Sequence, residues 1–234
     1  MTPETRSWDG NAVRADDLSF SEPFIWFVRI LFVVIIGNGF RTFSVNFSFE
    51  RFINTPTVTL LTVLAYFIAG YFFVISDFVF YQLQMMRYPY PKGTVGRFFE
   101  DIVIFFVLFL LLDLASVWPS PRKVWAFVFL AALWHFLVTC WQLHVNAQYE
   151  RLWKRGMSHG IRTAMYVLLW VLYTVRQATV PPPATGGAEE SVNAVMGWVW
   201  IVVMLIGLSN GVRLYTFARP TSRLAQWPRK FAGA

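Results

Sequence analysis

Apolar residues dominate six stretches of the chain, and polar or proline-containing segments separate them. The stretches are 24–44, 57–82, 98–117, 122–143, 160–180 and 193–216. A helix needs about 20 mostly apolar residues to cross the hydrocarbon core of a bilayer. The pattern therefore predicts an all-α protein, built as a polytopic bundle of six transmembrane helices.

Prolines mark several of the connections. Pro56 precedes the second stretch, Pro119 and Pro121 separate the third from the fourth, and residues 181–183 are three consecutive prolines. Proline interrupts a helix interior because it lacks a backbone N–H group. With these breaks, we expect an N-terminal cytoplasmic segment, a transmembrane domain and a basic cytoplasmic tail. Their bounds are 1–22, 23–216 and 217–234.

Basic residues are distributed unevenly between the two sides that six crossings define. One side holds 14 of the 20 Lys and Arg residues: Arg6, Arg14, Arg87, Lys92, Arg97, Arg151, Lys154, Arg155, Arg162, Arg213, Arg219, Arg223, Arg229 and Lys230. The other side holds five, and Arg29 lies within the first stretch. Loops rich in Lys and Arg stay in the cytoplasm. We therefore expect a multi-pass protein of the inner (plasma) membrane with both termini cytoplasmic.

Composition supports a membrane protein and disfavours a nucleic-acid-binding one. Of 234 residues, 56% are hydrophobic and only 14% are charged, whereas a soluble domain carries about 25% charged residues. The net charge is +7, but the bases gather in short loops, a pattern typical of membrane orientation and of contact with anionic lipid. We expect membrane lipids as partners and no nucleic acid.

Charged residues inside the apolar stretches are candidate functional groups. Arg29, Asp77 and Arg213 fall at similar depth, and Asp113 lies near the outer end of the third stretch. Such groups usually face a protein interior or water. Ion pairs of Asp77 with Arg29 or Arg213 that fix helix register, an arginine that reaches the headgroups, and a role in transport or gating all fit this pattern.

The acids Glu100 and Asp101 have a more ordinary interpretation. They stand at the beginning of the third apolar stretch, close after the basic loop that ends at Arg97. Unpaired backbone N–H groups and the helix dipole favour negative charge in a first helical turn. We interpret both as helix-start residues.

Polar residues recur at helical spacing in several stretches. The fourth stretch has His135, Thr139, Gln142 and Asn146 on one face, and the sixth has Gly207, Asn210 and Arg213 within about a third of the circumference. Asp77 belongs to a similar face in the second stretch. Such faces can line an aqueous path, or they can form the hydrogen-bonded seam of a bundle. Both interpretations remain open at this stage.

Motifs for metal, cofactor or catalytic chemistry are absent from the sequence. Cys140 is the single cysteine, so no disulfide forms within the chain. His135 and His144 are nine residues apart and point to opposite sides of one helix, which excludes a haem between them. We expect no metal, no cofactor and no enzymatic activity.

The end of the chain combines bases with apolar anchors. Its bases after the sixth stretch are Arg219, Arg223, Arg229 and Lys230, interspersed with Trp227 and Phe231. This pattern is typical of a segment that binds anionic lipid headgroups. A generic cytoplasmic retention signal explains it equally well.

Two functions fit the sequence. The first is a small oligomeric channel or transporter for ions or protons, in which Asp77 selects charge or accepts protons and His135 relays them, since histidine titrates near physiological pH. The alternative is a non-catalytic structural, assembly or sensory subunit of a larger membrane complex. The expected protein partners are copies of the chain or other membrane subunits.

Overall fold

The computed structural model describes residues 5–6, 12–13, 15–88, 90, 95–148, 153–179 and 188–218, and these residues are almost entirely helical. The helices are α1 (Ala15–Asn46), α2 (Phe49–Asn54), α3 (Thr57–Arg87), α4 (Gly96–Ala115), α5 (Pro121–Gln148), α6 (Trp153–Thr179) and α7 (Ala188–Ala218). Two-residue strands β1 (Thr5–Arg6) and β2 (Ala12–Val13) pair antiparallel before α1. The all-α prediction is confirmed.

Six of the seven helices are long, and each overlaps one predicted apolar stretch. The remaining helix, α2, is short: it has six residues. It begins after Ser48, whose side chain accepts a hydrogen bond from the backbone N–H of Arg51. Several long helices extend beyond the apolar residues that predict them. For example, α1 begins at Ala15 and includes Pro23, and α3 continues to Arg87.

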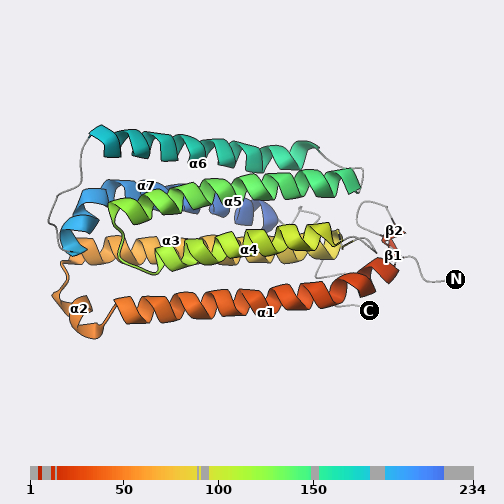
Figure 1. The fold of residues 1–234 in the computed structure, drawn as a ribbon, viewed down its shortest axis with the longest axis horizontal. Helices are drawn as coiled ribbons and strands as arrows, with labels where there is room; N and C mark the ends of the chain where they lie inside the picture. Colours follow the sequence, from red (N-terminus) through yellow and green to blue (C-terminus); the bar gives the residue numbers. More distant parts are fainter. Residues whose placement is uncertain are drawn as a thin grey trace.

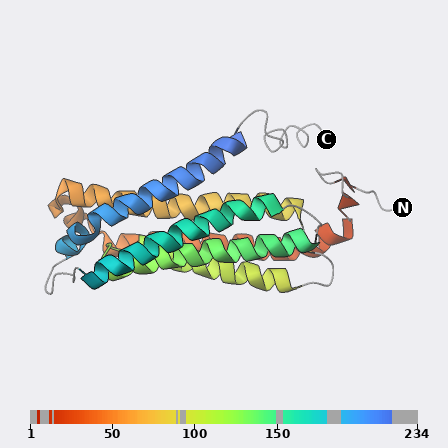
Figure 2. The ribbon, with the colours of Figure 1, turned by 90° about the horizontal axis from the view of Figure 1, so that it is seen from above.

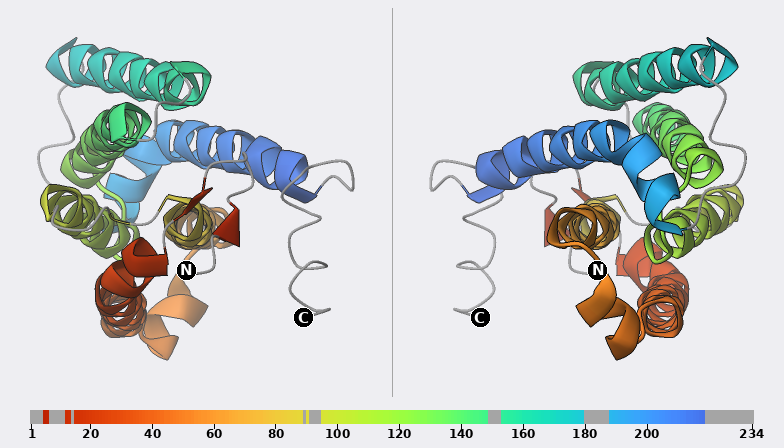
Figure 3. Two further views of the ribbon diagram at one scale, coloured as in Figure 1. Left: turned by 90° about the vertical axis from the view of Figure 1, so that its right-hand side faces the viewer. Right: turned by 90° about the vertical axis from the view of Figure 1, so that its left-hand side faces the viewer.

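The long helices form one bundle in which the chain runs back and forth (Figure 1). The beginning of α1 and the end of α7 lie toward the same end of the bundle, together with the ends of α3 and α5 and the beginnings of α4 and α6. Helix α4 packs against α1, α3 and α5, and α5 packs against α6 and α7. Helix α7 lies against α3 and crosses the others obliquely (Figures 2 and 3).

Four of the long helices are long and apolar enough to cross a membrane by length and composition. Their candidate spans are Ser21–Asn46, Thr57–Gln82, Pro121–Val145 and Glu190–Gly211. Helix α4 carries four charged residues in 20 positions, and α6 contains several arginines and polar groups. The structure is thus that of a helical protein suited to a membrane, whereas the count of six spans stays a prediction.

Several polar residues of α4 and α6 lie inside the bundle. In α4, Arg97 and Asp101 are fully buried, while Phe99, Val103 and Phe106 are exposed. In α6 the same division places buried His159 and Tyr166 inside and Ile161, Leu168 and Val175 outside. This arrangement, apolar outside and polar inside, matches a lipid environment.

Close helix packing occurs where α3 meets α4. A Cβ atom added at Gly70 of α3 would overlap the Cβ atom of Ala115 in α4. At Gly39 of α1, an added Cβ would lie 2.6 Å from the hydroxyl oxygen of Tyr71. Glycine at these two positions therefore lets α1, α3 and α4 approach closely.

Candidate functional site

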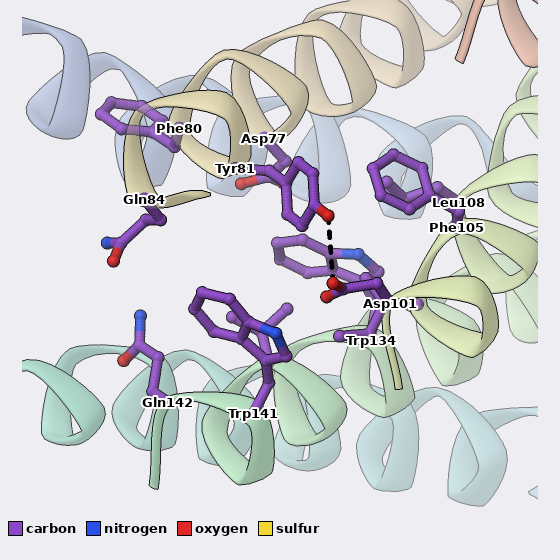
Figure 4. Close-up of a pocket in the computed structure, with 12 residues that line it drawn as sticks. Asp77, Phe80, Tyr81, Gln84, Asp101, Phe105, Leu108, Trp134, Trp141 and Gln142 are labelled. Atoms are coloured by element: carbon purple, nitrogen blue, oxygen red, sulfur yellow. Dashed lines mark hydrogen bonds between the residues drawn. The ribbon is translucent and has the colours of Figure 1, made fainter. Parts of the chain in front are cut away.

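A cavity of about 40 Å³ lies between α3, α4 and α5 (Figure 4). Its walls combine acids, amides and aromatic rings: Asp77, Phe80, Tyr81, Gln84, Asp101, Ile104, Phe105, Leu108, Trp134, Val138, Trp141 and Gln142. A site needs roughly 10–15 Å³ of such volume to hold one water molecule. The cavity therefore has room for a few waters or for a ligand of very few atoms.

Two tyrosine hydroxyl groups form hydrogen bonds with the carboxylate of Asp101 in this cavity. Its Oδ2 atom accepts hydrogen bonds from the hydroxyl groups of Tyr81, at 3.0 Å, and of Tyr90. The two hydroxyl oxygens are themselves 3.0 Å apart. The Oδ1 atom is buried and has no hydrogen-bond partner among the described residues. One oxygen of a fully buried carboxylate thus remains available to a ligand.

The helix-start interpretation of Asp101 is wrong. Helix α4 begins at Gly96, and its first turn contains no acid. Asp101 instead occupies the second turn on the buried face. Glu100, one position earlier, does not line the cavity, and its Oε1 atom lies 2.8 Å from Nδ1 of His144 in α5.

Tyr90 brings the connection before α4 into the site. Its backbone N–H donates to the hydroxyl oxygen of Ser21 in α1, at 2.7 Å, and its ring lies beside Phe24. Burial raises the pKa of Tyr90 well above the ordinary value for tyrosine, and the neighbouring Asp101 carboxylate adds to the effect. The phenol therefore stays protonated at physiological pH and donates to Asp101.

Arg97 packs against Tyr90 and against Trp141, a residue of the cavity wall. Its side chain is fully buried, and one of its nitrogens donates to the backbone carbonyl of Tyr88 at 2.7 Å. The guanidinium lies 5.0 Å from the Tyr90 ring centre and 5.3 Å from that of Trp141. The sequence places Arg97 at the end of a cytoplasmic loop, but the structure makes it a buried residue of α4 that fastens the loop to α5.

Asp77 connects the cavity with a second buried polar group. Its side chain is 3% exposed and lines the cavity from α3. Outside the cavity, Asp77 and Arg162 both lie near the buried hydroxyl of Tyr166 in α6. The ring of Tyr166 in turn stacks on the ring of His135, with 5.0 Å between centres.

His135 has a second histidine as a neighbour. The ring centres of His135 in α5 and His159 in α6 are 5.7 Å apart, and both side chains are buried. Trp134 packs against both rings. Spacing along one helix cannot reveal this pair, because the two residues come from different helices; the comparison of His135 with His144 alone therefore missed it.

Arg29 and Asp113 lie away from the cavity. Arg29 reaches α3, where its Nε atom donates to Oε1 of Gln82 at 3.1 Å, and its guanidinium lies 5.2 Å from the Trp26 ring centre. Asp113 accepts a hydrogen bond from Thr42 of α1, at 3.2 Å, toward the opposite end of the bundle. Both side chains bind neighbouring helices together.

Among the other predicted residues, Gln142 lines the cavity and Asn210 lies fully buried in α7. Neither atom of the Asn210 amide has a hydrogen-bond partner among the described residues. The side chain of Arg213 and the tail residues Arg219, Arg223, Arg229 and Lys230 lie outside the described part of the structure.

The part of the chain that the structure describes contains no cluster of metal-ligating side chains. There, no group of three or more His, Cys, Asp or Glu side chains converges to hold an ion. Comparison with family models, with curated proteins and with solved structures yields no match to the chain. Its function is therefore argued from the buried polar residues themselves.

Proposed function

We propose that the protein transports a small cation, which includes the proton, across the inner membrane. The observation that carries this proposal is the position of Asp77. It is buried and lines a cavity that also contains Asp101 and Gln142. Burying an ionisable group within a membrane costs several kcal/mol, so such groups are rare. Where they occur, they usually mark an ion or proton pathway.

The proposal includes six spans, both ends of the chain in the cytoplasm and the assembly of several copies. The inward direction of the charges on α4 and the apolar outer face of α6 support the two spans that composition alone does not identify. The uneven distribution of basic residues supports the orientation. In this arrangement the cavity lies nearer the cytoplasmic end, where α3 ends and α4 begins.

The residues divide into two stations. Asp77 and Asp101 hold the cation in the cavity, and His135 with His159 accepts a proton deeper in the bundle, since imidazole changes charge near physiological pH. Tyr166 belongs to the second station, because its ring stacks on that of His135. The polar face of α5 thus serves both, with Gln142 at the cavity and His135 at the second station.

Flux into liposomes that contain the pure protein tests this function. Asp77→Asn and His135→Ala should each reduce cation or proton flux about tenfold or more, since each removes a charged or titratable group from the pathway. Asp113→Asn is the matched control, because Asp113 bonds Thr42 far from the cavity. Its flux should equal that of the wild type.

An absence of flux in the wild type would overturn the transport proposal and favour the alternative, a non-catalytic subunit of a larger membrane complex. One feature fits that alternative: only 17% of the spanning part of α1 is buried. Its exposed residues include Trp26, Ile30 and Val33, which are available to lipid or to another chain. Extraction in mild detergent followed by mass analysis would then reveal the companion subunits.

A further inference from the structure

We propose that the cavity between α3, α4 and α5 binds an ammonium-type cation, either ammonium itself or a short primary amine. This inference rests on the proposed transport function in that it names the cargo. Binding is nevertheless measurable without flux, so the two proposals can fail separately.

Two side chains that line the cavity, one acid and one amide, each have a buried oxygen atom that can accept a hydrogen bond. Oδ1 of Asp101 and Oε1 of Gln142 are both buried, and neither has a hydrogen-bond partner among the described residues. Both side chains line the cavity, from α4 and α5 respectively. Buried acceptors without partners cost about 1–3 kcal/mol each, so the natural ligand is a group that donates several hydrogen bonds. A positive charge is favoured because Asp77 and Asp101 face the same space.

Aromatic rings form much of the remaining wall. They are Phe80, Tyr81, Phe105, Trp134 and Trp141. The face of an aromatic ring attracts a cation and also accepts the methyl or methylene groups of an amine. The chain already shows this preference, because the guanidinium of Arg97 lies over the Trp141 ring. A cation that carries both N–H donors and carbon fits these walls.

Metal ions fit the lining less well. Calcium takes six to eight oxygen ligands, and magnesium requires an octahedral set, whereas most side chains of this lining are aromatic or aliphatic. The cavity volume of about 40 Å³ limits the bound cation to one or two heavy atoms, with room for an additional water molecule. The indole N–H groups of Trp134 and Trp141, buried without partners among the described residues, can donate to such a water.

Direct binding of radiolabelled methylammonium to the purified full chain tests the inference. We expect saturable binding that unlabelled ammonium displaces, while potassium and the larger tetramethylammonium displace it only weakly. Asp101→Asn should weaken binding about tenfold or more, since it removes a charged acceptor. Glu100→Gln is the matched control: it makes the same change one position earlier in α4, but Glu100 pairs with His144 outside the cavity.

Gln142→Leu is the second variant, for the case that Asp101→Asn does not fold. It keeps the size of the side chain, removes only the amide, and should also weaken binding. The inference is overturned if wild-type protein binds no methylammonium, if potassium competes equally well, or if folded Asp101→Asn or Gln142→Leu binds like the control. Proton flux with no amine binding would leave the transport proposal standing, and amine binding without any flux would leave only the binding site.

Discussion

The carboxylate of Asp101 receives hydroxyl groups from two separate parts of the chain. Tyr81 donates from α3, and Tyr90 donates from the connection that precedes α4. Because both bond the same oxygen, they orient the carboxylate and leave its other oxygen to a ligand. The two phenols are therefore positioning groups for Asp101.

Removal of either hydroxyl should destabilise the protein. Tyr81→Phe and Tyr90→Phe each take one donor from a buried carboxylate, and we expect a loss of about 1–3 kcal/mol in the free energy of unfolding. Denaturant titration in detergent micelles measures it. Thr179→Val is the control, since the hydroxyl of Thr179 bonds only carbonyls of its own helix. Equal stability of both phenylalanine variants and the wild type would mean that the phenols do not support Asp101.

Spacing along the sequence identifies part of this site. Asp77, His135 and Gln142 stand out because each is polar within an apolar helix. Asp101 does not, since an acid near the beginning of a helix has an ordinary explanation. His159 does not either, because its significance comes from His135 on another helix, 5.7 Å away between ring centres. Contacts between helices depend on packing, which a single sequence does not display.

Helix α4 connects the cavity to the rest of the bundle, because it packs against α1, α3 and α5. One face carries the buried Arg97 and Asp101, and the opposite face carries exposed apolar residues. Its approach to α3 depends on Gly70, where no side chain separates the helices. This close contact holds α3 against α4 at the end of α4 that lies away from the cavity.

Gly70→Ala should therefore separate α3 from α4. The added methyl overlaps Ala115, and overpacking of this kind usually costs about 1–3 kcal/mol. Thermal unfolding of the detergent-solubilised protein measures the loss. Gly197→Ala in α7 is the matched control, because a Cβ there meets nothing within 4 Å. If Gly70→Ala is as stable as Gly197→Ala, the close approach of the two helices does not contribute to stability.

The long helices follow directly from the apolar pattern, but their ends do not. Hydropathy marks where side chains become polar, whereas hydrogen bonding along the backbone continues past that point. Hence α3 extends five residues beyond its predicted end at 82, to Arg87, and α4 begins two residues before 98, at Gly96. The short helix α2 escapes the pattern because it is too brief to show a period, although Ser48 caps it.

At the scale of the whole molecule, the bundle brings the beginning of α1 and the end of α7 to one end (Figure 1). The cavity lies nearer that end, which is the cytoplasmic side in the proposed six-span arrangement. This arrangement requires α4 and α6 to cross the membrane with the other four. If only the four helices with apolar composition cross, the buried charges of α4 no longer lie within the bilayer.

Accessibility of a cysteine at position 120 tests this requirement most directly. In a Cys140→Ser background, which removes the single native cysteine, Ser120→Cys lies in the connection between α4 and α5. Six spans place it outside the cell, and four spans place it inside. Asn54→Cys is outside and Val95→Cys inside under both arrangements, so they serve as references. With six spans, a membrane-impermeant maleimide should label position 120 in intact cells as fully as position 54; protection equal to that of position 95 would mean that α4 does not cross the membrane.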